Sequence, residues 1–240
     1  MANEIIDINT IFGFWPRKNA DISLGTLLKL METKAVTRAL TLSARGIFYD
    51  FIEGNNETFR ACQNNQRLIP AATVNPCRWL NCLDEAKRVI NKGVRLFRFF
   101  PQYQEWHIGD APFSKLLDKV LGPSKVGLMI PASEGITAIG KLAENLDNPI
   151  IIEGLRYDKL AEAIVVINQT SNVYIETHII NSPDFVELLT QEVGSNHLIF
   201  GSNTPLSYIG AAIAPIEFAN VSQQDKVLIF SRNLHRILGV

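Results

Sequence analysis

The sequence predicts an α/β protein, a single (β/α)8 TIM barrel that takes in residues 1–240. Three observations support this fold class: strand and helix patterns alternate along the whole chain, eight such pairs fit into 240 residues, and each predicted strand is an almost continuous apolar run. Strands buried on both faces of a parallel sheet show such runs, whereas half-buried strands alternate polar and apolar residues. A βα unit needs about thirty residues, so eight units leave little chain for a second domain.

The predicted strands are short apolar segments that end at small residues, polar residues or proline. In chain order we expect them at residues 5–9, 36–42, 67–76, 94–100, 127–130, 149–152, 173–179 and 198–201. Helices with apolar residues spaced three or four apart are expected between them, at 24–31, 55–64, 84–91, 113–120, 136–146, 157–167 and 184–193. A last helix is expected to begin at Ser222, because Asp225 follows at the spacing of a helix-capping pair.

An open, doubly wound sheet is the alternative arrangement for alternating strands and helices. Such a sheet commonly binds a phosphate on a glycine-rich turn after its first strand. The segment at that place is Asn9-Thr10-Ile11-Phe12-Gly13, which contains a single glycine and no such turn. The closed barrel is therefore the preferred prediction.

Composition and charge exclude several classes of partner. A net charge of −1 gives no electrostatic attraction to nucleic acid or to an anionic membrane, and no apolar run approaches the ~18–20 residues of a membrane-spanning helix. The first residues lack the basic and apolar regions of a signal peptide. Three cysteines are too few for a disulfide framework, so we expect reduced thiols and a cytoplasmic location. With nucleic acid and membrane excluded, the expected partner is a small-molecule substrate or ligand.

Residues 198–205 mark the predicted site. The apolar strand ends at Gly201, and the polar residues Ser202, Asn203 and Thr204 follow at once. In parallel α/β barrels the C-terminal ends of the strands form the ligand-binding face. This segment resembles the Gly-Ser-Asp-x-Pro segment that closes the barrel of the amidohydrolases, the metal-dependent hydrolases and decarboxylases of the amidohydrolase-2 type, with Asn203 in place of the aspartate.

The resemblance covers nearly the whole chain, but it departs from the family pattern at the metal-binding positions. Asn9 and Ile11 stand where two metal-binding histidines are expected, Pro131 stands where a third is expected, and Glu153 lies at or beside a fourth. A hydrolytic metal site needs three or more nitrogen or oxygen ligands. The resemblance therefore implies a divergent member without the usual metal and without a cofactor; a divalent cation held by Glu153 and Glu176 is the alternative.

Polar residues at the predicted strand ends form the candidate site. The candidate catalytic residues are Glu153, Glu176 and Asn203, and the candidate substrate-binding residues are Arg98, Asn9, His178 and Trp15. Two carboxylates, an arginine and a histidine suffice for general acid–base chemistry on an anionic substrate. Glu176 and His178 would share one face if both lie on a strand. The same charged groups could instead form a buried ion network that satisfies itself.

Two classes of function follow from these residues. The first is an amidohydrolase-like hydrolase or lyase that acts on a small carboxylated or cyclic ester or amide substrate without the usual catalytic metal. Arg98 would anchor the substrate, and Glu153 or Glu176 would be the general base. The alternative is a catalytically degenerate relative, a pseudoenzyme that binds a ligand or a partner protein. By resemblance, a homodimer is also expected among such barrels.

Overall fold

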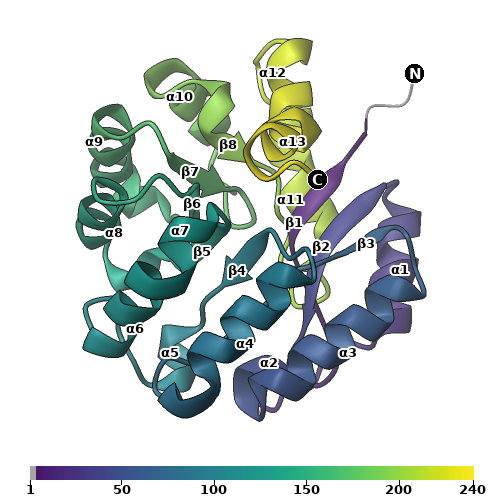
Figure 1. Cartoon of the computed structure of the whole chain (residues 1–240). Coiled ribbons are helices and arrows are strands. Elements are labelled where there is room, and N and C mark those ends of the chain that lie inside the picture. The colour runs from purple at the N-terminus through teal and green to yellow at the C-terminus, as the bar shows by residue number, and fades with distance from the viewer. Residues whose placement is uncertain (1–3) are drawn as a thin grey trace.

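The computed structural model describes residues 4–240 and confirms the predicted barrel (Figure 1). The eight strands are β1 (Ile6–Phe12), β2 (Arg38–Ser43), β3 (Leu68–Pro70), β4 (Leu96–Arg98), β5 (Gly127–Pro131), β6 (Ile150–Glu153), β7 (Val173–Glu176) and β8 (Leu198–Ile199). Neighbouring strands pair in parallel in the order β1-β2-β3 and β4-β5-β6-β7-β8.

Backbone hydrogen bonds close the ring at the two places where these sheets meet. At the first seam the Ala72 amide donates to the carbonyl of Leu96 at 3.0 Å and the Arg98 amide donates to the carbonyl of Ala72 at 2.9 Å, which joins the end of β3 to β4. At the second seam the Ile8 amide donates to the carbonyl of Phe200 at 3.1 Å, which joins β1 to the end of β8. The eight strands therefore have no free edge.

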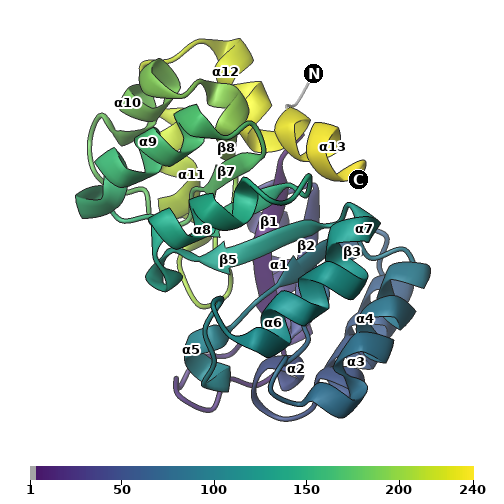
Figure 2. The same cartoon turned by 60° about the vertical axis from the view of Figure 1, so that its left-hand side comes forward.

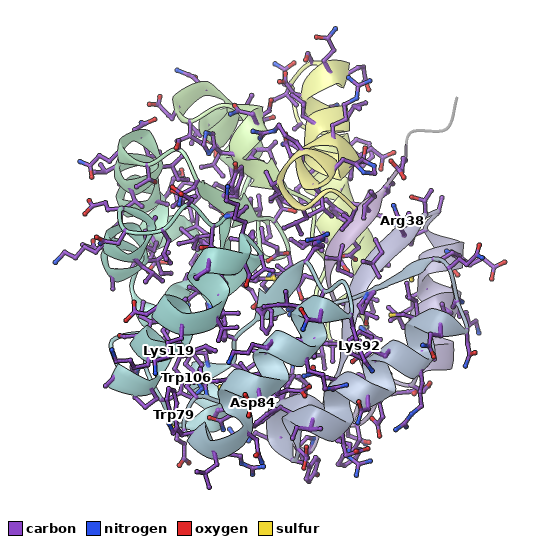
Figure 3. The ribbon with its side chains drawn as sticks, viewed as in Figure 1. Arg38, Trp79, Asp84, Lys92, Trp106 and Lys119 are labelled. Carbon is purple, nitrogen blue, oxygen red and sulfur yellow. The ribbon has the colours of Figure 1, made fainter. Side chains whose placement is uncertain are left out.

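The helices lie outside the ring of strands, as Figures 1 and 2 show. They are α1 (Leu24–Thr33), α2 (Arg45–Phe48), α3 (Phe51–Gln63), α4 (Trp79–Asn91), α5 (Pro101–Gln104), α6 (Ala111–Leu116), α7 (Gly122–Ser124), α8 (Ile136–Ala143), α9 (Leu160–Gln169), α10 (Phe185–Glu192), α11 (Ile209–Glu217), α12 (Gln223–Val227) and α13 (Asn233–Leu238). Their outer faces carry charged side chains such as Asp84 and Lys92 on and after α4 (Figure 3). No helix among residues 4–240 is long and apolar enough to cross a membrane.

Two buried apolar clusters divide the interior. On β5, Leu128 and Ile130 belong to a cluster that also contains helix residues such as Ile139, whereas Met129 belongs to the other cluster. Successive side chains of a strand point to opposite faces, so the first cluster fills the space between strands and helices and the second fills the barrel. Burial of strands on both faces explains their continuous apolar runs.

The last helix covers the end of the barrel at which the strands begin. Leu234 and Leu238 of α13 belong to the cluster that fills the barrel. Gly127, the first residue of β5, allows this approach, because a Cβ atom there would lie 2.6 Å from Cδ2 of Leu238. The opposite end, where the strands finish, is left for the candidate site.

Several element boundaries differ from the sequence predictions for local reasons. Helix α3 begins at Phe51 rather than at residue 55, because Asp50 caps it by accepting hydrogen bonds from the amides of Ile52 at 2.8 Å and Glu53 at 3.0 Å. The third strand is shorter than predicted: β3 ends at Pro70, and one further hydrogen bond, from the Ala71 amide to the carbonyl of Thr41 at 2.9 Å, joins it to β2. The predicted capping pair of Ser222 and Asp225 is present at the start of α12.

Candidate active site at the mouth of the barrel

A cavity of about 250 Å³ opens at the C-terminal ends of the strands. Loops that follow six of the eight strands contribute to it, together with Ile11 near the end of β1 and the last residues of β5 and β6. Its wall includes Ile11, Trp15, Lys18, Phe100, Tyr103, Pro131, Ser133, Glu153, His178, Asn203 and Leu206. Four candidate site residues (Trp15, Glu153, His178 and Asn203) therefore share one cavity.

Trp15 forms an aromatic side of this cavity. Its indole ring meets Phe48 edge to face with ring centroids 4.8 Å apart, and it meets Tyr103 in the same way at 5.3 Å. Such contacts fix the orientation of the rings. The exposed Lys18, three residues after Trp15, adds a positive charge to the same wall.

Glu153 stands at the end of β6 and is held from below by two buried residues. Its Oε1 accepts hydrogen bonds from Nδ2 of Asn9 at 3.1 Å and from Nη2 of Arg98 at 3.0 Å. Nη2 of Arg98 also donates to Oδ1 of Asn9 at 2.6 Å. Arg98 is fully buried and does not line the cavity, so the structure places this arginine beneath Glu153 rather than in the wall where a substrate would meet it.

His178 and Glu176 form a second buried pair. The carboxylate of Glu176 accepts a hydrogen bond from the backbone amide of His178 at 2.8 Å, and its Oε2 lies 2.5 Å from Nδ1 of the imidazole. Strand β7 ends at Glu176, so the two residues do not share a strand face as predicted; the chain turns, and the carboxylate bonds to both the backbone and the ring of His178. Nδ1 is thus engaged, and the ring of His178 lines the cavity.

The charge of His178 follows from these neighbours. Burial alone lowers the pKa of an imidazole, but the charge and hydrogen bond of Glu176, together with the charge of Glu153, raise the pKa of His178 above its ordinary value. These neighbours of His178 therefore favour its imidazolium form. An imidazolium whose Nδ1 is bonded to a carboxylate presents its Nε2–H as a proton donor.

Gly201 makes room for the Glu176 carboxylate. A Cβ atom at position 201 would lie 2.0 Å from Oε1 of Glu176 and 2.6 Å from its Cδ. No such contact is sterically allowed, so a side chain at this position would displace the carboxylate. This glycine, two residues after β8, thus permits the pair formed by Glu176 and His178.

A third buried carboxylate, Asp7 of β1, was not predicted as a site residue. Its Oδ1 accepts hydrogen bonds from the amides of Asn9 at 2.9 Å and Ser202 at 3.0 Å, and its Oδ2 accepts one from the hydroxyl of Ser202. Burial is the main cause that raises the pKa of Asp7 to about 7, and the charge of Glu176 contributes in the same direction. A lone carboxylate within an apolar strand is the sequence signal that points to this residue.

Asn203 follows the eighth strand in a backbone conformation that few residues adopt. Its φ is 55°, in the left-handed region that asparagine tolerates better than most side chains. Its Nδ2 donates to Oγ of Ser207 at 3.4 Å. The side chain is therefore held at the edge of the cavity wall.

The donor atoms of this mouth do not fit a catalytic transition-metal site. Ile11 and Pro131 contribute only carbon side chains to the cavity wall. Within residues 4–240, no three His, Cys, Asp or Glu side chains come together in a way that could hold a metal ion. Glu153 is bonded to Arg98, and Glu176 is bonded to His178, so the two carboxylates are paired with separate cations.

No protein-family model and no curated protein matches this sequence. Several solved structures share the fold. A 5-carboxyvanillate decarboxylase from Sphingomonas paucimobilis is 13% identical with a TM-score of 0.80, and the match covers 100% of both chains. A probable 2-pyrone-4,6-dicarboxylic acid hydrolase from Acinetobacter baumannii is 13% identical with a TM-score of 0.77 over 99% of this chain and 100% of that one.

A third similar structure is a 5-carboxyvanillate decarboxylase from Novosphingobium aromaticivorans complexed with manganese. It is 12% identical with a TM-score of 0.76, and the match covers 100% of this chain and 97% of that one. At this level of identity the comparisons establish a common barrel fold and no more. They support the resemblance to amidohydrolases at the level of the fold.

Proposed function

We propose that this barrel is a metal-independent acid–base hydrolase or lyase for a small, cyclic, carboxylated substrate. The observation that carries the proposal is the presence of Glu153 and His178 in the wall of one cavity, each held by a buried partner of opposite charge. The carboxylate of Glu153 and the imidazolium form of His178 carry opposite charges. Pairs of titratable groups held in different charge states supply an acid and a base to one reaction.

In ester hydrolysis, Glu153 is the base and His178 is the acid. Oε2 of Glu153 receives no hydrogen bond from residues 4–240, whereas Oε1 receives two. Oε2 takes a proton from a water molecule as the water oxygen bonds to the ester carbonyl carbon. Nε2 of His178 gives its proton to the leaving oxygen as the carbon–oxygen bond breaks. Solvent then returns the proton from Glu153 to His178, and both residues regain their starting charge.

The shape and charge of the cavity support a small ring-shaped anion as substrate. Its volume of about 250 Å³ lies just below the range of ligand pockets for drug-sized molecules, roughly 300–1,000 Å³. Trp15 and Tyr103 supply aromatic faces, and Lys18 supplies a positive charge for a carboxylate. The similar folds include enzymes named for carboxyvanillate and for a pyrone dicarboxylic acid, which agree with this class of substrate.

Ligand binding without catalysis is the second candidate function. It is favoured by the hydrogen bonds that join Arg98, Asn9 and Glu153 to one another, because they pair the buried charges in the absence of a substrate. Turnover distinguishes the two functions.

The test is hydrolysis of a panel of small lactones and cyclic carboxylates in the presence of a metal chelator. We expect turnover by the unmodified protein and a loss of roughly 10²-fold in kcat for Glu153→Gln and for His178→Asn, because each removes one proton-transfer group. His107→Asn is the matched control: His107 lies outside the cavity, is exposed, and has its Nδ1 3.4 Å from Glu134. Equal rates in all four proteins would refute the mechanism. Tight binding of a panel member without turnover would favour the second candidate function.

The pH dependence of kcat provides a further prediction. His178 acts as an acid, so kcat should fall as the pH rises through its pKa, which lies above the ordinary value because of Glu176. Glu176→Gln keeps a hydrogen-bond acceptor but removes the charge, and should move this alkaline limb to lower pH by about one unit or more. A limb that stays in place in Glu176→Gln would show that another group supplies the proton.

A further inference from the structure

Arg98 is surrounded by oxygen atoms that converge on its guanidinium. Nη1 donates to the backbone carbonyl of Thr10 at 3.0 Å, and Nη2 donates to Oδ1 of Asn9 at 2.6 Å and to Oε1 of Glu153 at 3.0 Å. The side chain has no exposed surface, and the ring of Phe100 lies 5.4 Å from Cζ. A single fixed positive charge therefore sits directly beneath the cavity.

The three oxygens around Arg98 belong to the donor types that a hard divalent cation prefers. Mg²⁺ and Mn²⁺ bind carboxylate, amide and backbone carbonyl oxygens, and one of each type contacts the guanidinium. The oxygens come from β1 and β6, two strands that the barrel fixes in position. The hydrogen bond from Nδ2 of Asn9 to Oε1 of Glu153 at 3.1 Å does not involve the guanidinium, so we expect it to keep these two side chains together when the guanidinium is removed.

We propose that Arg98 is a built-in cation of the barrel mouth, which balances the charge of Glu153 and keeps divalent metal ions from these oxygens. The arginine is tethered to β4 and already occupies the donor atoms, so an entering metal ion would meet both a filled site and a like charge. This inference rests on the proposed function, because it explains how Glu153 can work as a base without a metal. Arg98 is thus a positioning residue rather than a substrate anchor.

The test is binding of Mn²⁺ alone, measured by the loss of the electron paramagnetic resonance signal of the free ion on titration. We expect no stoichiometric binding by the unmodified protein. Arg98→Met leaves an uncompensated carboxylate among three oxygens and is expected to bind one Mn²⁺ at least tenfold more tightly than the unmodified protein does. In the double variant Arg98→Met with Glu153→Gln, this binding should disappear.

Two further variants distinguish the effect of losing the positive charge at position 98 from a general disturbance of the structure. Arg45→Met is the matched control, since Nη1 of Arg45 lies 2.8 Å from Oε1 of Glu57 in a half-exposed pair that lacks the converging backbone and amide oxygens; it should gain no Mn²⁺ binding. Arg98→Lys keeps the positive charge and should also gain none. If Arg98→Met fails to fold by circular dichroism, Arg98→Gln replaces it, because its amide is neutral and can still donate a hydrogen bond.

The outcomes are decisive in either direction. Mn²⁺ binding by the unmodified protein that Glu153→Gln abolishes would overturn the inference, and so would a folded neutral variant at position 98 that gains no binding. Gain of Mn²⁺ binding by the neutral variant alone would support it. The readout is binding and not turnover, so a protein that proves inactive on the substrate panel would refute the proposed function while leaving the role of Arg98 testable by the same titration.

Discussion

Replacing Asp7 with asparagine is expected to remove a large pH dependence from the stability of this protein. The pKa of Asp7 is raised from 3.8 to about 7 by burial, so the folded state favours the protonated carboxyl. A raised pKa contributes stability that is fully present below the unfolded value and is lost as the pH rises through the folded value. Each pH unit across that window removes about 1.4 kcal/mol, which amounts to about 4 kcal/mol by neutral pH.

Asparagine can keep the contacts of Asp7 without a charge. Its Oδ1 can accept from the amides of Asn9 and Ser202, and its Nδ2 can donate to the hydroxyl of Ser202, which lies 2.5 Å from Oγ1 of Thr204. We therefore expect Asp7→Asn to be more stable than the unmodified protein above about pH 7 and to lose its advantage toward about pH 4. Chemical denaturation at a series of pH values measures the difference.

Asp21→Asn provides the control for this comparison. Asp21 is exposed, and hydrogen bonds from Thr26 and Ser23 lower its pKa. Its contribution to stability is present above the unfolded pKa and is lost as the pH falls through the folded pKa, so Asp21→Asn should have no stabilising effect at high pH. Parallel stability curves for Asp7→Asn and the unmodified protein would contradict a protonated, buried Asp7.

The second large effect is expected for Gly201→Ala. The new Cβ would lie 2.0 Å from Oε1 of Glu176, so either the carboxylate or the segment that follows β8 must move. Overpacking of this kind costs roughly 1–3 kcal/mol, and we expect a value near the upper end, about 3 kcal/mol, with a melting temperature lower by about 10 °C. Loss of the contact between Glu176 and His178 should also move the alkaline limb of kcat to lower pH.

A second substitution separates the clash from other effects of the new methyl group. Gly201→Ala with Glu176→Ala removes the carboxylate that the Cβ would meet, and should recover much of the lost stability without restoring the pH limb. Gly109→Ala is the matched control, because no atom of residues 4–240, beyond Gly109 and its two chain neighbours, lies within 4 Å of a Cβ atom there. If Gly201→Ala resembles Gly109→Ala in stability and pH profile, the carboxylate is not confined as described.

The barrel was predictable because its determinants are local. Continuous apolar runs alternating with helical spacing indicate eight βα units, and the pair of Ser222 and Asp225 marks one helix start from four residues of sequence. The predicted start of a helix was wrong where a single local contact decides it. The cap at Asp50 begins α3 four residues before the predicted start, and no apolar pattern records that contact.

The site was only partly predictable, because its geometry depends on residues far apart in the sequence. Their positions at the predicted strand ends correctly placed Glu153, His178 and Asn203 at the mouth of the barrel. The same reasoning could not tell that Arg98 lies beneath the cavity, since its depth is set by contacts with Asn9, 89 residues away. Nor could the sequence show that the missing side chain of Gly201 leaves room for the carboxylate of Glu176. That contact depends on how β7 packs beside the segment after β8.

The seam between the first and last strands also has a consequence for how the protein is made. Asp7 and Ser202 are 195 residues apart, so β1 leaves the ribosome long before its second neighbour exists. A growing chain that pairs β1, β2 and β3 carries exposed strand edges throughout that interval, and such edges are templates for pairing with other chains. Contacts of such wide sequence separation also slow folding. The completed ring is therefore less prone to aggregation than the growing chain, whose strand edges are exposed.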